Sequence, residues 1–150
     1  MKKNALTVTV GILLIMYALI NLGAAVGQFS KGKVFSGTTS AVVSLGKLAG
    51  DTKGAADVKK EGMELSAVLY LIALFILFTA VLELVTAVGL FGGQNWAFTA
   101  LILASICGAL VEMQDTAEDG FGIGKLIFFT INALALIAAF AGKEQELVGA

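Results

Sequence analysis

Residues 66–91, SAVLYLIALFILFTAVLELVTAVGLF, form an unbroken apolar run that decides the fold of the rest of the chain. As a helix this run crosses a bilayer, since about 20 residues at a rise of 1.5 Å each span the hydrocarbon core. Its one carboxylate, that of Glu83, is about eight residues or roughly 12 Å from the end of the run. The surrounding apolar residues outweigh the insertion cost of a single acid. We therefore predict a membrane-spanning helix that carries a carboxylate into the hydrocarbon region.

The composition places the whole chain in the membrane class. Hydrophobic residues make up 58% and charged residues 14% of its 150 residues, whereas soluble domains have about 45–50% and 25%. The mean hydropathy is +0.93. We predict an all-α polytopic membrane protein of the lipid bilayer. Its net charge of −1 gives no reason to expect nucleic-acid binding.

Proline and histidine are both absent from the sequence, and each absence restricts the prediction. Without proline, no helix has a built-in kink. Without histidine, the chain itself cannot provide bis-histidine haem ligation, a histidine-ligated metal site or a histidine proton relay. We therefore predict no cofactor and no metal ligands in this chain.

Apolar segments predict four transmembrane helices in a single domain over residues 1–150. The expected spans are residues 5–26, 65–91, 96–113 and 121–141. The first is longer than the apolar core of about 7–15 residues in a secretory signal, so we expect it to be retained. Gly92 and Gly93 predict a tight turn between the second and third spans. Both termini then lie on one side of the membrane.

The segment between the first two spans, residues 27–62, is rich in Lys, Gly, Ser and Thr, and we interpret it as a polar loop. Within it, Val42, Val43, Leu45 and Leu48 have loosely helical spacing. This spacing fits a short amphipathic helix on a surface, and it fits equally a solvated loop with one apolar patch. The lysines of this loop favour a cytoplasmic location for it, whereas Lys2 and Lys3 favour the reverse.

Glu83 has small or hydroxyl-bearing neighbours one helical turn away on either side, Thr79, Ala80, Thr86 and Ala87. This pattern indicates that its face is turned toward other helices. Residues at a matching depth on the third and fourth spans extend the layer, so the predicted intramembrane polar cluster is Glu83, Thr79, Thr86, Ser105 and Asn132. The carboxylate then serves as a proton-binding group, a gate or part of a quinone headgroup site, or it only fixes helix packing.

Two further sets of residues are candidates for packing and for the membrane interface. Small residues at a spacing of four allow helices to approach closely, and the predicted packing residues are Ala80, Ala87, Ala100, Ala104 and Gly108. The predicted interface charges are Glu64, Glu112 and Lys125. Glu64 falls at the start of the second span, and Lys125 is close enough to the end of the fourth span for its amine to extend back to the surface.

Two segments, VLELVTAVGLFGGQNWAFTALILASI (residues 81–106) and KLIFFTINALALIAAFAG (residues 125–142), carry a family resemblance. An acid, an apolar half-helix, a glycine turn and a helix rich in small residues follow one another in the first segment. The chain thereby resembles the DoxX-like family of small four-helix membrane proteins. The resemblance implies a four-helix bundle that serves as a membrane subunit of a redox assembly passing electrons to quinone, with Glu83 as the family's acid.

The first functional hypothesis is an accessory or structural subunit that anchors or organises a larger, redox- or quinone-linked complex in a prokaryotic cytoplasmic membrane. The alternative is a small transporter or a proton- or ion-conducting protein that oligomerises and uses Glu83. The expected partners are other membrane subunits or further copies of the chain. A third hypothesis, an independent quinone-reactive enzyme, has the least support, because no catalytic set is evident.

Overall fold

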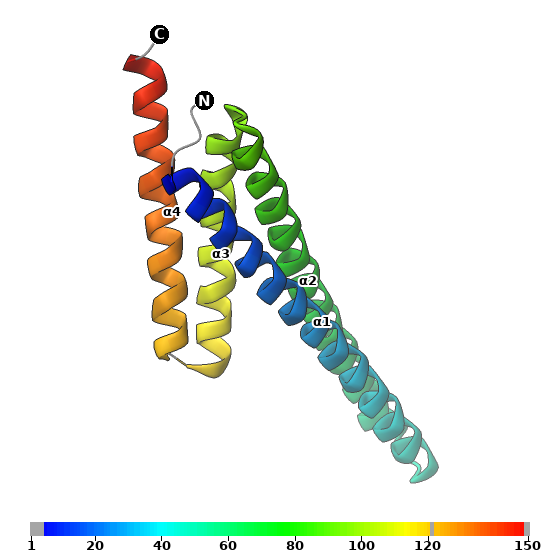
Figure 1. Cartoon of the computed structure of the whole chain (residues 1–150). Coiled ribbons are helices and arrows are strands. Elements are labelled where there is room, and N and C mark those ends of the chain that lie inside the picture. Colours follow the sequence, from blue (N-terminus) through cyan, green and yellow to red (C-terminus); the bar gives the residue numbers. More distant parts are fainter. Residues whose placement is uncertain (1–4, 121, 149–150) are drawn as a thin grey trace. The chain divides into compact units, whose positions relative to one another are not determined.

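The computed structural model describes residues 5–120 and 122–148, and all of their regular structure is helical (Figure 1). The helices are α1 (Ala5–Leu48), α2 (Thr52–Gly92), α3 (Trp96–Asp119) and α4 (Ile123–Val148). The all-α prediction is therefore confirmed.

Three of these helices are long and apolar enough to cross a membrane. The qualifying stretches are Thr7–Leu48, Thr52–Gly92 and Trp96–Gln114, and they support the predicted membrane class. In α4 the apolar stretch found within the described residues is Lys125–Ile137, which is shorter than the roughly 20 residues of a full span. The fourth span thus stays a prediction, and Phe121 at its start lies outside the described residues.

The polar loop predicted for residues 27–62 is wrong, because the helices on both sides extend through it. Helix α1 continues to Leu48 and α2 begins at Thr52, which leaves a connection of three residues. The hydroxyl groups of Ser40 and Ser44 donate to the carbonyl oxygens of Ser36 and Ser40, at 3.0 and 2.9 Å. Such bonds to the preceding turn satisfy the hydroxyls inside a helix. With no proline to interrupt it, the polar segment remains helical, and residues 22–48 of α1 and 52–77 of α2 form a helical hairpin.

Each of the first two connections is closed by a glycine in the left-handed conformation. Gly50 has φ +84° after α1, and Gly93 has φ +70° after α2. The backbone N–H of Asp51 donates to Gly46 O at 3.0 Å and that of Gly50 to Lys47 O at 3.1 Å, the paired bonds of a Schellman motif. The same two bonds recur around Gly93. The predicted glycine turn between the second and third helices is present.

The chain divides into two compact units. The first unit comprises Met1–Asn21 and Phe78–Ala150, and the second comprises Leu22–Leu77. The first unit therefore contains the beginning of α1, the end of α2, and all of α3 and α4. The prediction of one four-helix domain over the whole chain stays a prediction.

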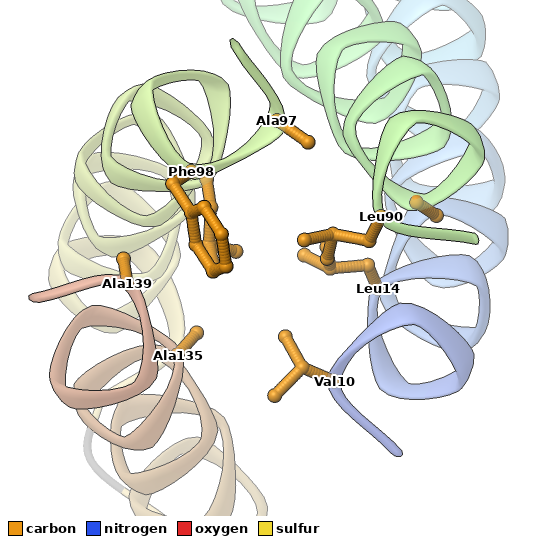
Figure 2. Packing of buried hydrophobic residues seen from close by; sticks show 9 residues of the cluster. Val10, Leu14, Leu90, Ala97, Phe98, Ala135 and Ala139 are labelled. Carbon is orange, nitrogen blue, oxygen red and sulfur yellow. The ribbon is translucent and has the colours of Figure 1, made fainter. Parts of the chain in front are cut away.

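An apolar cluster at one end of the first unit joins all four of its helical segments (Figure 2). Leu14 of α1 and Leu90 of α2 lie side by side and point toward Phe98 of α3, and Val10 of α1 points into the same core. The remaining buried members are Ala87, Ala97, Leu101, Ala135 and Ala139. The alanines among these residues keep the helix backbones close together.

Small residues also bring the two helices of the second unit into close contact. A Cβ atom placed on Gly46 would lie 3.3 Å from Ala55 Cβ, and one on Gly32 would lie 3.1 Å from the Tyr70 ring. The Phe29 and Tyr70 rings pack with centroids 6.0 Å apart. The two helices of this hairpin therefore pack closely at Gly46 and Gly32 and through the Phe29–Tyr70 ring pair.

Candidate functional site

The carboxylate of Glu83 lies inside the first unit, with an exposed fraction of 0%. Its hydrogen-bond donor is Asn21 of α1, whose Nδ2 lies 3.1 Å from Oε1 and 3.0 Å from Oε2. The amide group therefore binds both carboxylate oxygens. This pairing offsets part of the cost of burying an acid among helices.

A second carboxylate, Glu112 of α3, is also buried, with an exposed fraction of 7%. The Tyr17 hydroxyl of α1 donates to Glu112 Oε1 at 2.7 Å. Glu112 is thus buried within the first unit, and its location at the membrane interface stays a prediction. Because α3 continues to Asp119, Glu112 lies about two turns before the end of the helix and reaches into the bundle.

Asn132 of α4 extends the hydrogen bonds around Tyr17. Its Nδ2 donates to Tyr17 Oη and to the carbonyl oxygen of Phe128, each at 3.2 Å. The Tyr17 and Phe128 rings also pack against each other, with centroids 4.9 Å apart. Tyr17 therefore links α1 to both α3 and α4.

The hydroxyl-bearing residues predicted around Glu83 are all buried in the first unit. Thr79 and Thr86 are fully buried and Ser105 is 1% exposed. Thr86 Oγ1 donates to the carbonyl oxygen of Leu82 in its own helix, at 2.7 Å. The Ser105 hydroxyl has no hydrogen-bond partner among the described residues. These residues are therefore buried in one unit with Glu83, but the bond that holds Glu83 comes from Asn21, which was not among the predicted residues.

The predicted packing residues occupy the interior of the same unit. Ala80, Ala87, Ala104 and Gly108 are buried, and Ala100 is partly buried. A Cβ atom on Gly108 would lie 3.0 Å from Asn132 Oδ1 and 3.2 Å from Tyr17 Cε1. Glycine at this position thus allows the tyrosine and the asparagine to pack directly against α3.

The two remaining predicted interface charges lie elsewhere. Glu64 is exposed in the second unit. It lies about three turns inside α2, which begins at Thr52, so its predicted position at a helix start is wrong. Lys125 is partly buried in the first turn of α4.

Tyr17 and Asn21 are functional candidates that the sequence-based prediction missed. They lie four residues apart on α1 and therefore project from the same face, one turn from each other. Two strongly polar side chains at that spacing within an apolar span were the available signal. The predicted polar cluster takes its residues from the second, third and fourth spans, and so it does not contain these two residues of the first span.

The arrangement is a polar network centred on one turn of α1. Asn21 binds Glu83 of α2, and Tyr17 binds Glu112 of α3 and Asn132 of α4. Chemically, the two carboxylates can accept protons, and neutral donors stabilise them in place. Within the described residues, no group of three or more His, Cys, Asp and Glu side chains could hold a metal ion.

Comparisons with protein-family models, with curated proteins and with solved structures found no match to this chain. The resemblance to the DoxX-like family therefore stays a prediction.

Proposed function

We propose that this protein is an accessory membrane subunit that anchors or organises a larger complex, in a prokaryotic cytoplasmic membrane. The observation that carries the proposal is the polar network described above. Three side-chain contacts join α1 to each of the other three helical segments of the first unit. Such bonds fix the rotation and depth of each helix, which is what a scaffold requires.

The proposal includes a fourth transmembrane crossing by α4. Ala135 and Ala139 of α4 belong to the same apolar core as the other three segments, and Asn132 belongs to the polar network. Because α4 packs against its neighbours in this way, we expect it to cross the same thickness of bilayer as they do.

Apolar side chains on the outside of α3 and α4 support an association with other subunits as well as with lipid. They are Leu103, Ile106, Leu110, Met113, Leu126, Ile127, Leu134, Ile137 and Phe140, all at least half exposed or nearly so. Large apolar side chains of this kind suit contact with lipid, and another subunit on this surface would pack through these side chains and not through the small residues that bring helix backbones close together. The family resemblance further implies that the partner belongs to a redox assembly linked to quinone.

Purification in a gentle detergent followed by native mass spectrometry tests the subunit role. We expect one or more different chains bound at a fixed stoichiometry, and an optical spectrum of the preparation reveals any haem or other pigment that they carry. The Tyr17→Phe/Asn21→Leu double variant is expected to lose the partner, because its network is removed. A parent chain that purifies alone, or only with copies of itself, contradicts the proposal.

A second candidate function, proton or ion conduction, is favoured by the pair of buried acids. Asn21 binds Glu83 and Tyr17 binds Glu112, and these two residues lie one turn apart on α1. Two groups that can accept protons are therefore buried in the same helical unit. The test compares flux into proteoliposomes for the parent, Glu83→Gln and Glu112→Gln, with Glu64→Gln as the control for an exposed acid. If the protein conducts, Glu83→Gln and Glu112→Gln should lose flux, and Glu64→Gln should keep it. Absence of flux in the parent, or equal flux in every variant, eliminates this candidate.

A further inference from the structure

The helical hairpin of the second unit contains a groove that the proposed function does not use. Its volume is about 590 Å³, within the range of roughly 300–1,000 Å³ that is typical of small-molecule sites. One wall comes from α1 and includes Ser40, Ser44 and Lys47, and the other comes from α2 and includes Lys59 and Ser66. The groove is therefore lined by hydroxyl groups and amines.

A buried hydroxyl in the groove has no partner within the described part of the chain. Ser66 is 6% exposed, and its Oγ makes no hydrogen bond with the described residues. An unpaired buried hydroxyl costs free energy unless a ligand or water binds it. Ser66 lines the groove, so a ligand in the groove has a donor available to it.

Two lysines give the groove a preference for anions. Lys47 and Lys59 both line it, and neither forms an ion pair with another residue in the described part of the chain. Over the whole second unit, six lysines outnumber four carboxylates. The charge of the site is thus complementary to a phosphate group.

The polarity of the α2 wall changes along its length. Beyond Lys59 the groove is lined by Met63, Ala67 and Tyr70, which follow one another on the same helix face. Ser66 and the residues after it begin the long apolar run of α2. One end of the groove is therefore basic. The other end has an apolar wall on α2, opposite the hydroxyl groups of Ser36, Thr39 and Ser40 on α1, which suits the glycerol and acyl part of an amphiphile.

We propose that this groove binds an anionic membrane phospholipid. The phosphate group lies between Lys47 and Lys59 at the basic end of the groove. The glycerol and acyl part extends along Met63, Ala67 and Tyr70, where the Ser66 hydroxyl donates to an ester oxygen of the lipid. Basic pockets beside membrane-spanning helices are suited to such headgroups. This assignment depends on the membrane location of the chain and not on its role as a subunit.

The test measures binding of dihexanoyl phosphatidylglycerol to the purified full chain in detergent, by native mass spectrometry and titration. Dihexanoyl phosphatidylcholine and glycerol 3-phosphate are the comparison probes. The groove variant is Lys47→Gln/Lys59→Gln. Its matched control is Lys53→Gln/Lys60→Gln, which removes the same charge from exposed lysines of the same hairpin that do not line the groove. Ser66→Ala is tested separately, since removal of an unpaired hydroxyl leaves the fold intact.

We expect one tightly bound phosphatidylglycerol per chain. The groove variant should weaken it by about 30-fold and Ser66→Ala by about ten-fold, with the control within a few-fold of the parent. Equal losses in the groove variant and its control would mean general electrostatic attraction and would overturn the site. Equal affinity for phosphatidylcholine would overturn the preference for an anionic lipid, and equal affinity for glycerol 3-phosphate would overturn the role of the acyl chain. All these measurements use the isolated chain, so a failure to find a protein partner leaves their outcome unaffected.

Discussion

The Tyr17 hydroxyl donates a hydrogen bond to Glu112 Oε1 at 2.7 Å, between residues 95 positions apart in the sequence. The same hydroxyl oxygen accepts a hydrogen bond from Asn132 Nδ2. A single phenol group therefore binds a buried acid on α3 and a buried amide on α4. Its removal takes one hydrogen bond from each of these two partners.

Tyr17→Phe should destabilise the bundle by about 1–3 kcal/mol, because a buried carboxylate loses this donor while the ring packing is kept. Tyr70→Phe is the matched control, since Tyr70 is exposed in the second unit. Its stability should stay within about 0.5 kcal/mol of the parent. Unfolding by a denaturing detergent, followed by circular dichroism, measures both. Equal stability of the two variants would show that the Tyr17–Glu112 bond is not important for the fold.

Asn21 and Glu83 should behave as a coupled pair. Asn21→Leu leaves both carboxylate oxygens of Glu83 without this donor and should cost about 2–3 kcal/mol. Glu83→Leu together with Asn21→Leu removes the acid as well, so the double variant should be more stable than the sum of the single effects predicts. A double-mutant cycle in the same unfolding assay gives the coupling energy. Strict additivity would contradict the direct contact.

Gly108 should not tolerate a side chain. Gly108→Val places methyl groups where Asn132 Oδ1 and the Tyr17 ring already lie, at 3.0 and 3.2 Å from a first Cβ atom. We expect a loss of about 1–3 kcal/mol. Gly23→Ala in α1 is the contrasting variant, because nothing lies within 4 Å of its Cβ position, and it should stabilise the helix by about 0.5–1 kcal/mol. The two variants should therefore shift the unfolding midpoint in opposite directions, and a shift of both in one direction would contradict the close packing at Gly108.

Asp51 should contribute to the helical hairpin as the N-cap of α2. Its Oδ1 accepts a hydrogen bond from the backbone N–H of Gly54 at 2.9 Å. Asp51→Ala should cost about 0.5–2 kcal/mol, and Asp51→Asn much less, since asparagine caps helices about as well. Hydrogen exchange of the first turn of α2 is the sensitive measurement. We expect faster exchange in the alanine variant than in the asparagine variant, and identical rates would argue against the cap.

The sequence was sufficient for three long apolar helices but not for the segment between the first two. Residues 66–91 predicted a membrane helix because their apolar length alone requires it. The lysines, glycines and serines of residues 27–62 instead favoured a loop, and that prediction failed. The serine hydroxyls bond to the preceding turn of α1, and the small residues let the two helices pack closely, as at Gly46 and Ala55.

The candidate site was predicted as a set of buried polar residues but not as a set of bonds. The small neighbours of Glu83 indicated its buried face correctly, and the structure places the carboxylate inside the bundle. Depth along a helix follows from residue counting, whereas the rotation of each helix follows only from packing. For this reason the sequence could not show that Asn132 binds Tyr17 or that Glu112 points inward.

The hydrogen bonds from Asn132 through Tyr17 to Glu112 have a fixed direction. Tyr17 has a single hydroxyl proton and donates it to an acceptor, so the group on its other side must itself be a donor. An ionised aspartate at position 132 has nearly the same shape as asparagine, yet it would put acceptors on both sides of that one proton. Proton count, and not size, therefore decides which side chains this position of α4 accepts.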